Sequence, residues 1–131
     1  MRKIILDTNF LMVPFQFNVD IFSEIERICN FSYNLVAFEG SKKELEKILK
    51  TGSGRDKKAA AIALKMIESK NINVIKSEGS HVDELILENA VKGTIVATQD
   101  MALKRILTEK GVPLIILRQK KYLQIIERKA L

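Results

Sequence analysis

Short apolar runs alternate with longer stretches of mixed polarity along the whole chain. Each run is four or five residues long and rich in Ile, Leu and Val, which is typical of a buried strand. These runs predict strands at residues 3–6, 34–38, 72–75, 94–98 and 114–117.

Apolar residues recur at helical spacing in the stretches between the runs. In the second predicted helix, Ser41 is the expected N-cap, Glu44 completes a capping box and Gly52 is the expected C-cap. The apolar run Phe10–Val13 predicts a short helical turn or loop that stops at Pro14. The full set of predicted helices lies at 20–29, 41–51, around 59–67, 82–92 and 100–110.

Strands separated by helices predict an α/β three-layer sandwich, because parallel neighbouring strands need a helical crossover between them. We expect a central parallel sheet of about five strands. The first strand, which ends in Ile4-Ile5-Leu6, is apolar on both faces and is therefore expected at the centre of the sheet. No linker or repeat divides the chain, so residues 1–131 are expected to form a single domain. The basic tail from about residue 118 should pack on that domain as a helix or an extended segment.

Composition narrows the class of protein. Apolar residues make up 47% of the chain, so a core can form without disulfides. The lone Cys29 falls in a helical pattern and is expected to be a buried, reduced thiol, since a catalytic thiol needs a histidine beside it. No apolar run approaches the roughly 20 residues that span a bilayer, so we expect a soluble cytoplasmic protein with no membrane partner. The net charge of +6 allows loose attraction to polyanions.

Acidic residues follow the first four predicted strands. Asp7 closes the first strand, Glu44 and Asp83 lie in the first turn of the helices after the second and third, and Asp100 follows the fourth. The carboxyl ends of parallel strands open on one edge of the sheet, so we expect these four acids to converge there. Their neighbours Glu46 and Glu84 share stripes with charged residues and are expected to face solvent.

Each acid has a simpler explanation when it is considered alone. Asp7, Asp83 and Asp100 could be helix N-caps, and Glu44 could complement a helix dipole. Four carboxylates crowded at one edge repel one another, however, unless a cation neutralises them. Oxygen ligands of this kind suit Mg²⁺ or Mn²⁺, whereas zinc usually comes with histidine or cysteine, and neither accompanies these acids in the sequence.

The ordered set of motifs resembles the PIN domain family. The motifs are Asp7-Thr8-Asn9, Glu44-Leu45, Asp83-x-x-Ile86-x-x-x-Ala90 and Thr98-Gln99-Asp100. The resemblance covers nearly the whole chain and implies a parallel sheet of order 3-2-1-4-5. It also implies a metal-dependent ribonuclease whose catalytic and metal-binding residues are Asp7, Glu44, Asp83 and Asp100, with Thr8, Asn9 and Thr98 as polar support.

The C-terminal part of the chain bears on which branch of the family it resembles. Residues 111–123 look most like archaeal relatives of the ribosomal-RNA-processing nuclease of the small-subunit processome. VapC-type toxins share the acids but are less similar in this part. The resemblance therefore implies either rRNA processing or a toxin activity, with RNA, a second copy of the chain, and an antitoxin or a ribosome-assembly factor as partners. Asp83 is the one clear acid on the inward stripe of its helix, which leaves one or two metal ions open.

The implied reaction is hydrolysis of an RNA phosphodiester, in which Mg²⁺ or Mn²⁺ activates a water and neutralises charge in the transition state. The alternative is a non-catalytic PIN-fold module that binds RNA or protein. A haloacid-dehalogenase-like phosphatase fits poorly because Asn9 replaces its second aspartate, and a response-regulator receiver lacks its acid after the third strand. Basic residues expected to hold the RNA backbone are Arg55, Lys57, Lys58, Arg118, Lys120 and Lys121.

Overall fold

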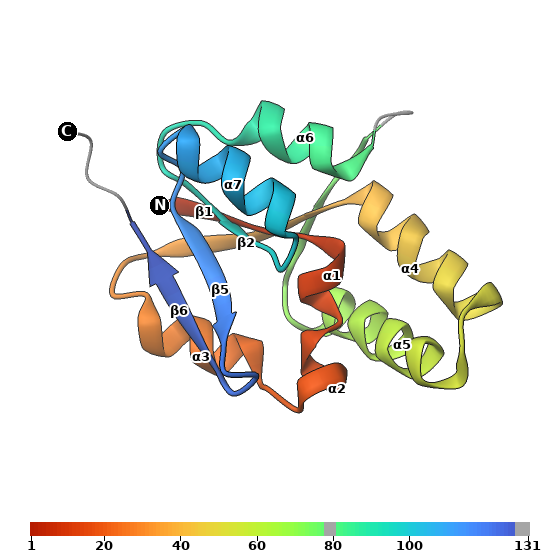
Figure 1. Ribbon diagram of the computed structural model, residues 1–131. Helices are drawn as coiled ribbons and strands as arrows, with labels where there is room; N and C mark the ends of the chain where they lie inside the picture. The colour runs from red at the N-terminus through yellow and green to blue at the C-terminus, as the bar shows by residue number, and fades with distance from the viewer. Residues whose placement is uncertain (78–80, 128–131) are drawn as a thin grey trace.

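A computed structural model describes residues 1–77 and 81–127. They form a six-stranded sheet of order β3-β2-β1-β4-β5-β6 with helices on both faces (Figure 1). The strands are β1 (Arg2–Leu6), β2 (Tyr33–Phe38), β3 (Asn73–Ile75), β4 (Thr94–Ala97), β5 (Leu114–Arg118) and β6 (Tyr122–Ile126). The helices are α1 (Thr8–Leu11), α2 (Val13–Phe17), α3 (Ile21–Ile28), α4 (Glu39–Thr51), α5 (Gly54–Ser69), α6 (Val82–Asn89) and α7 (Met101–Glu109).

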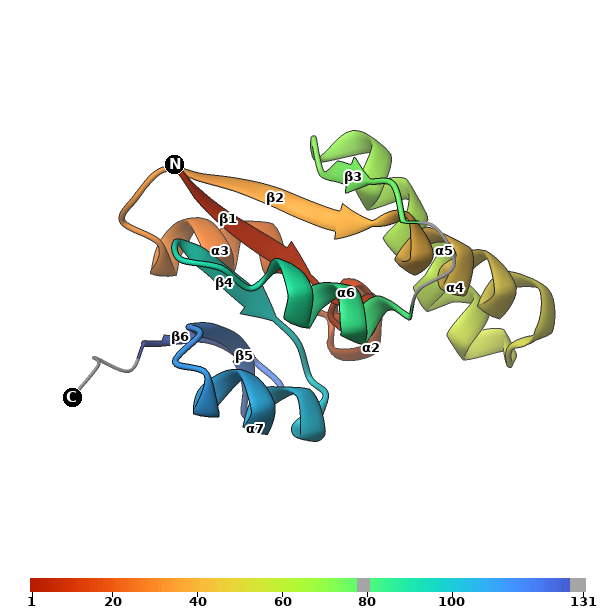
Figure 2. The same cartoon turned by 90° about the horizontal axis from the view of Figure 1, so that it is seen from above.

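Strand β1 lies at the centre of the sheet and pairs in parallel with β2 and β4. Its side chains alternate between two hydrophobic cores: Ile4 and Leu6 pack with α1 to α5, whereas Ile5 packs with α6 and α7. Figures 1 and 2 show the resulting three layers, with α6 and α7 on one face and α3 and α5 on the other. The predicted α/β class and the order 3-2-1-4-5 of the parallel strands are confirmed.

The sheet has one strand more than the sequence predicted. The basic tail turns back after Arg118 and forms β6, which pairs antiparallel with β5. The turn places two non-glycine residues in the left-handed region, Gln119 at φ 51° and Lys120 at φ 55°. Glu24 and Arg27 of α3 then bind the outer edge of β6, accepting from the Leu123 N–H at 2.9 Å and donating to its carbonyl at 3.1 Å.

Helix α4 begins earlier than predicted, and the predicted capping box is wrong. The helix starts at Glu39, directly after β2, so Ser41 lies inside it and Glu44 falls in its second turn. Gly40 makes this early start possible, because a Cβ there would lie 2.9 Å from Val82 Cγ2 of α6. The Ser41 side chain is fully buried and contacts Thr8 instead of capping the helix. Gly52 is the C-cap, as predicted.

Three smaller differences concern element ends. Pro14 lies in the first turn of α2, where its missing N–H costs little, so it begins a helix rather than stopping one. Helix α6 ends at Asn89 rather than at Lys92, and Gly93 serves the turn into β4 at φ 86°. Cys29 is a buried free thiol, as predicted, and burial raises its pKa. Over the described part of the chain, no helix is long and apolar enough to cross a membrane.

Candidate active site

Asp7 lies at the carboxyl end of the central strand β1, where the chain turns into α1. It is only 9% exposed, and both of its carboxylate oxygens accept hydrogen bonds. Oδ1 accepts from the Thr8 N–H at 2.8 Å and so caps α1, while Oδ2 accepts from the Thr98 hydroxyl at 2.7 Å. Burial raises the pKa of Asp7, the bonds from Thr98 and Thr8 oppose that rise, and the charges of Asp100 and Asp83 add to it.

The segment after β4 is tied to the Asp7 turn by two polar side chains. The fully buried Thr98 hydroxyl donates to Asp7 and accepts from the Asp100 N–H at 3.0 Å. The Asn9 side-chain oxygen Oδ1 accepts from the Gln99 N–H at 3.2 Å. Asp100 Oδ1 caps α7 by accepting from the Leu103 N–H at 3.0 Å. These bonds fix the positions of Asp7 and Asp100 relative to each other across the β1–β4 pair.

Glu44 reaches the same place from α4, on the other side of β1. The Thr8 hydroxyl donates to the Ser41 hydroxyl at 2.7 Å, which joins the start of α1 to the first turn of α4. Partial desolvation raises the pKa of Glu44, and the neighbouring Thr8 opposes this rise. The charges of Asp7 and Asp83 raise that pKa further, whereas His81 lowers it. The pKa of Glu44 therefore responds to two of the other three acids and to a histidine.

Asp83 lies in the first turn of α6, and its Oδ1 accepts from the Glu84 N–H at 3.0 Å. Helix α6 has no side-chain cap, because its N-cap residue is His81. Asp83 thus does not cap the helix from the N-cap position, which was the simpler explanation for it.

The four predicted acids line one pocket of about 290 Å³. Asp7 lies buried at its base, whereas the other three acids are exposed around it. Glu46 and Glu84, which the sequence pattern assigned to solvent, do not line the pocket. The complete lining is Asp7, Thr8, Asn9, Met12, Glu44, Ile48, His81, Val82, Asp83 and Asp100.

The four acids line the same pocket, but their carboxylates do not converge on one point. Within residues 1–77 and 81–127, no three acidic, histidine or cysteine side chains converge closely enough to enclose a metal ion. Uncompensated carboxylates repel one another, and three of these four have room to turn outward. A divalent cation would reverse the sign of that interaction. The donors are mainly carboxylate oxygens, which fit Mg²⁺ or Mn²⁺.

Sequence reasoning missed two polar residues, His81 in the pocket and Ser41 beside it. It treated histidine as absent from the acids, and this is wrong, because His81 lines the pocket beside Asp83. Its place two residues before Asp83 was visible in the sequence. Ser41 was taken for a helix cap, and only the tertiary structure reveals its contact with Thr8.

The structure does not bring the predicted basic residues into the acid pocket. Arg55, Lys57 and Lys58 lie in the first turns of α5, where Arg55 donates to the Gln16 carbonyl and stacks on Phe15. The second group lies at the turn between β5 and β6, with Arg118, Lys120 and Lys121 exposed. This turn follows the carboxyl end of β5 and therefore lies on the same edge of the sheet as Asp100.

Comparisons with known proteins agree with the architecture. A family model described as "PIN like domain" matches residues 4–120. Ribonuclease VapC4 of Methanocaldococcus jannaschii is 37% identical over 127 residues, which cover 95% of this chain and 97% of that protein. Ribonuclease VapC9 of Archaeoglobus fulgidus is 34% identical over 121 residues, which cover 92% of this chain and 86% of that protein.

Solved structures with lower sequence identity share the fold. The PIN domain endonuclease Utp24 superposes with a TM-score of 0.74 at 22% identity, covering 96% of this chain and 92% of that one. A domain of a functionally unknown protein from Methanocaldococcus jannaschii superposes with a TM-score of 0.61 at 17% identity, covering 100% of this chain and 97% of that one. From the family match over most of its length and the relatives above 30% identity, the chain belongs to the PIN-like domain family.

Proposed function

We propose that this protein is an endoribonuclease that hydrolyses RNA phosphodiesters at the acid pocket and requires Mg²⁺ or Mn²⁺. The observation that carries the proposal is the meeting of four acids, from four different elements, in one pocket whose deepest member is buried. Two relatives that align with nearly the whole chain are named ribonucleases. We infer the same activity for this chain and assign it to the acid pocket.

Asp7, Glu44, Asp83 and Asp100 would hold one or two divalent ions. A bound ion lowers the pKa of a water to make a nucleophile and stabilises charge on the phosphate in the transition state. Thr98 orients Asp7 and lowers its pKa by donating to Oδ2. Thr8 donates to the Ser41 hydroxyl on α4, the helix that carries Glu44, and Asn9 holds the loop that carries Asp100. These three residues thus act on the positions and charges of the acids.

RNA would approach this negative pocket along basic residues nearby, because backbone phosphates dominate nucleic-acid affinity. Of the two basic groups, the β5–β6 turn with Arg118, Lys120 and Lys121 is on the edge of the sheet that carries Asp100. Arg55, Lys57 and Lys58 on α5 form a second surface that RNA can reach. A homodimer, an antitoxin or a ribosome-assembly factor, and a cytoplasmic location, are further parts of this proposal.

The decisive experiment measures cleavage of RNA by the purified protein with Mg²⁺, with Mn²⁺ and with EDTA. We expect cleavage only with a divalent ion, leaving 5′-phosphate ends. Asp7→Asn should lower the rate by about 100-fold or more, since it removes a ligand at the base of the pocket. Glu46→Gln, an acid two residues from Glu44 on the outer face of α4, is the matched control and should retain activity.

Binding of Mn²⁺ separates the proposal from its alternative. The electron paramagnetic resonance signal of free Mn²⁺ should fall when wild-type protein is added. The signal should fall less when Asp7→Asn is added. Cleavage in EDTA that is equal for wild type and Asp7→Asn would reject the nuclease proposal. A protein that binds RNA but neither cleaves it nor binds Mn²⁺ would instead be a non-catalytic module.

A further inference from the structure

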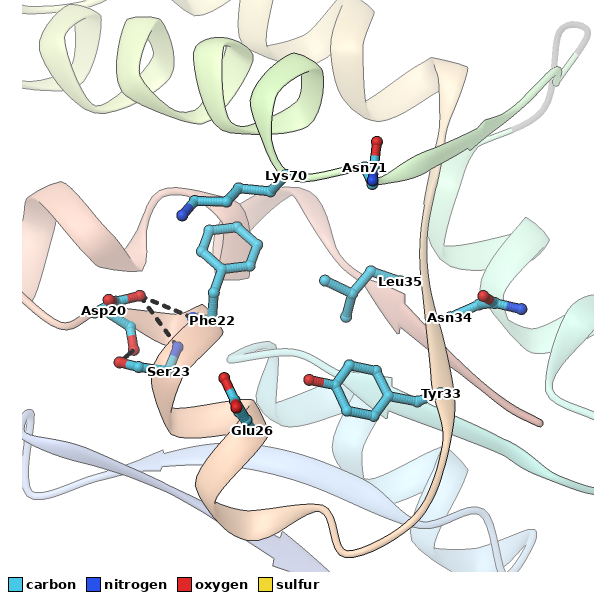
Figure 3. Close-up of a pocket in the computed structure, with 9 residues that line it drawn as sticks. All are labelled: Asp20, Phe22, Ser23, Glu26, Tyr33, Asn34, Leu35, Lys70 and Asn71. Atoms are coloured by element: carbon cyan, nitrogen blue, oxygen red, sulfur yellow. Dashed lines mark hydrogen bonds between the residues drawn. The ribbon is translucent and has the colours of Figure 1, made fainter.

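Two hollows on the α1–α5 face of the sheet share no residue with the acid pocket. The larger, about 460 Å³, lies over β2 between α3 and the end of α5 (Figure 3). Its neighbour, about 270 Å³, shares Asp20, Phe22 and Lys70 with it and continues past Pro14, Val19 and Met66. We call the two together the α3–α5 groove. Each hollow has room for a side chain and not only for a small ion.

The two hollows are separated by Lys70 and Phe22, which form a cation–π pair. The Lys70 ammonium lies 5.4 Å from the centroid of the Phe22 ring, and Figure 3 shows its side chain extended above that ring. Asp20 lies close by, and its pKa is lowered first by a hydrogen bond from the Ser23 N–H and last by the charge of Lys70. The groove therefore already accommodates a positive group between an aromatic face and a carboxylate.

The other half of the groove offers the same chemistry without an internal cation. Figure 3 shows the Tyr33 hydroxyl pointing toward Glu26, with Leu35 between Tyr33 and Phe22. Across the described residues, Glu26 makes no ion pair. Tyr33 and Leu35 lie at alternate positions of β2 and therefore face the same side of the sheet. Both side chains are half-buried. An aromatic ring, an apolar floor and an unpaired carboxylate thus line one opening.

Charge decides which class of partner fits. Two carboxylates and one ammonium line the groove, so it is locally negative on a protein whose net charge is +6. Such a surface repels nucleic-acid phosphates and attracts a cation. Arginine suits it better than lysine, because a planar guanidinium can stack on Tyr33 while it donates to the Glu26 carboxylate.

We propose that the α3–α5 groove docks a segment of a protein partner in which an arginine is flanked by apolar residues. The guanidinium lies between Tyr33 and Glu26, and the flanking side chains cover Leu35 and the hollow beside Met66. Lys70 marks the boundary between the two parts and competes weakly for the same charges. This surface is independent of the acid pocket, so the proposal stands or falls apart from nuclease activity.

The test is a titration of the full chain with an acetylated, amidated Ala-Leu-Arg-Leu-Ala peptide, followed by backbone and aromatic NMR. Matched peptides carry citrulline or glutamate in place of arginine. We expect saturable shifts centred on Phe22, Glu26 and Tyr33, with the arginine peptide binding about fivefold more tightly than the citrulline peptide. Glu26→Gln should remove that difference, Lys70→Met should strengthen binding about twofold, and Glu109→Gln on α7 should change nothing.

Four results would overturn the proposal. Equal affinity for the arginine and citrulline peptides would show that charge is not recognised. Wild-type affinity in Glu26→Gln, or no saturable shift in the groove, would show that the surface is not the site. Shifts of the same resonances by a short RNA rather than by the peptide would assign the groove to nucleic acid instead.

Discussion

At the scale of single residues, Thr98 is the non-acidic side chain on which the site most depends. Its hydroxyl donates to Asp7 Oδ2 and accepts from the Asp100 N–H, and it is fully buried. One hydroxyl thus orients one acid and fixes the start of the helix that the other acid caps. Its replacement should therefore be felt in the chemistry as well as in stability.

Thr98→Val should test this role, because valine keeps the shape and removes both bonds. The pKa of Asp7, which Thr98 holds down, should rise, so the acidic limb of the pH–rate profile should move to higher pH. The free energy of unfolding should fall by about 1–3 kcal/mol, since a buried acceptor and an N–H lose their partner. Thr98→Ser should restore the profile. An unshifted profile in Thr98→Val, with activity lowered at every pH equally, would contradict the charge-holding role.

The buried charge of Asp7 also predicts how stability depends on pH. Burial raises its pKa above the ordinary value of 3.8, so the folded state favours the protonated form. The stability this contributes is present below the unfolded pKa and is lost as pH rises through the raised folded pKa. In EDTA, wild type should therefore lose stability relative to Asp7→Asn between pH 3 and pH 7. Calorimetric melting of both proteins across that range measures the difference, and parallel curves would refute it.

Divalent ions should increase the stability of the folded protein, because they neutralise the acids of the pocket. A ligand that binds only the folded state at 100 times its dissociation constant adds about 2.7 kcal/mol of stability. Mn²⁺ should therefore raise the melting temperature of wild type and raise that of Asp7→Asn less. Glu46→Gln should respond like wild type, which makes it the control for non-specific binding to acidic surface.

Sequence reasoning was strongest for residues whose position along the chain decides their place. Asp7 and Asp100 follow strands, and the carboxyl ends of parallel strands must share an edge. Ser41 was misassigned because a serine three residues before a glutamate looks like a capping box wherever it occurs. Its actual partner, Thr8, is 33 residues away, and no local pattern encodes that contact.

At the scale of elements, the approach of α4 to α6 brings Glu44 and Asp83 to the pocket. The two helices meet where Gly40 faces Val82, with room for no Cβ, and the Gly40 N–H donates to the Ser77 hydroxyl at 3.1 Å. The helix starts are therefore set by a glycine that carries no chemistry. The separation of two of the four acids depends on this contact.

Gly40→Ala should push the helix starts apart. An added Cβ would lie 2.9 Å from Val82 Cγ2, so a shift of backbone or side chain is required. We expect a loss of about 1–3 kcal/mol in unfolding free energy and weaker Mn²⁺ binding. The double variant Gly40→Ala with Val82→Ala removes the clashing methyl groups and should recover metal affinity. Failure of Val82→Ala to rescue Gly40→Ala, although both fold, would show that the contact does not set the acids.

The β6 edge of the sheet was the part predicted least well from the sequence. Hairpins are recognised in a sequence by Asn-Gly or Asp-Gly turns, whereas here Gln119 and Lys120 take the left-handed conformation. The outer edge of β6 is closed by side chains of Glu24 and Arg27 rather than by another strand. The central strands were predictable because burial on both faces makes them continuously apolar, whereas β6 carries exposed polar residues between its buried ones.

At the scale of the whole molecule, the four pocket acids concentrate negative charge in a protein of net charge +6. The rest of the surface is correspondingly more basic, and its basic residues are not placed evenly around the pocket. Burial lowers the pKa of Lys104 on α7, the charge of Arg118 lowers it further, and Asp100 opposes both. The charge of Lys104 thus interacts both with Asp100 in the acid pocket and with Arg118 at the β5–β6 turn.

The two basic groups should therefore differ in their effect on RNA. Both triple variants are made in the Asp7→Asn background, so that binding of a single-stranded RNA is measured without cleavage. Replacing Arg118, Lys120 and Lys121 with glutamine should weaken binding. It should also reduce the slope of log affinity against log salt by about 0.7 for each phosphate that is no longer neutralised. The same change at Arg55, Lys57 and Lys58 should have the smaller effect, because the β5–β6 turn follows the strand next to β4 on the edge of the sheet that carries Asp100. A larger loss of affinity from the α5 group would place the RNA path across α4 and α5, on the opposite side of β1 from Asp100.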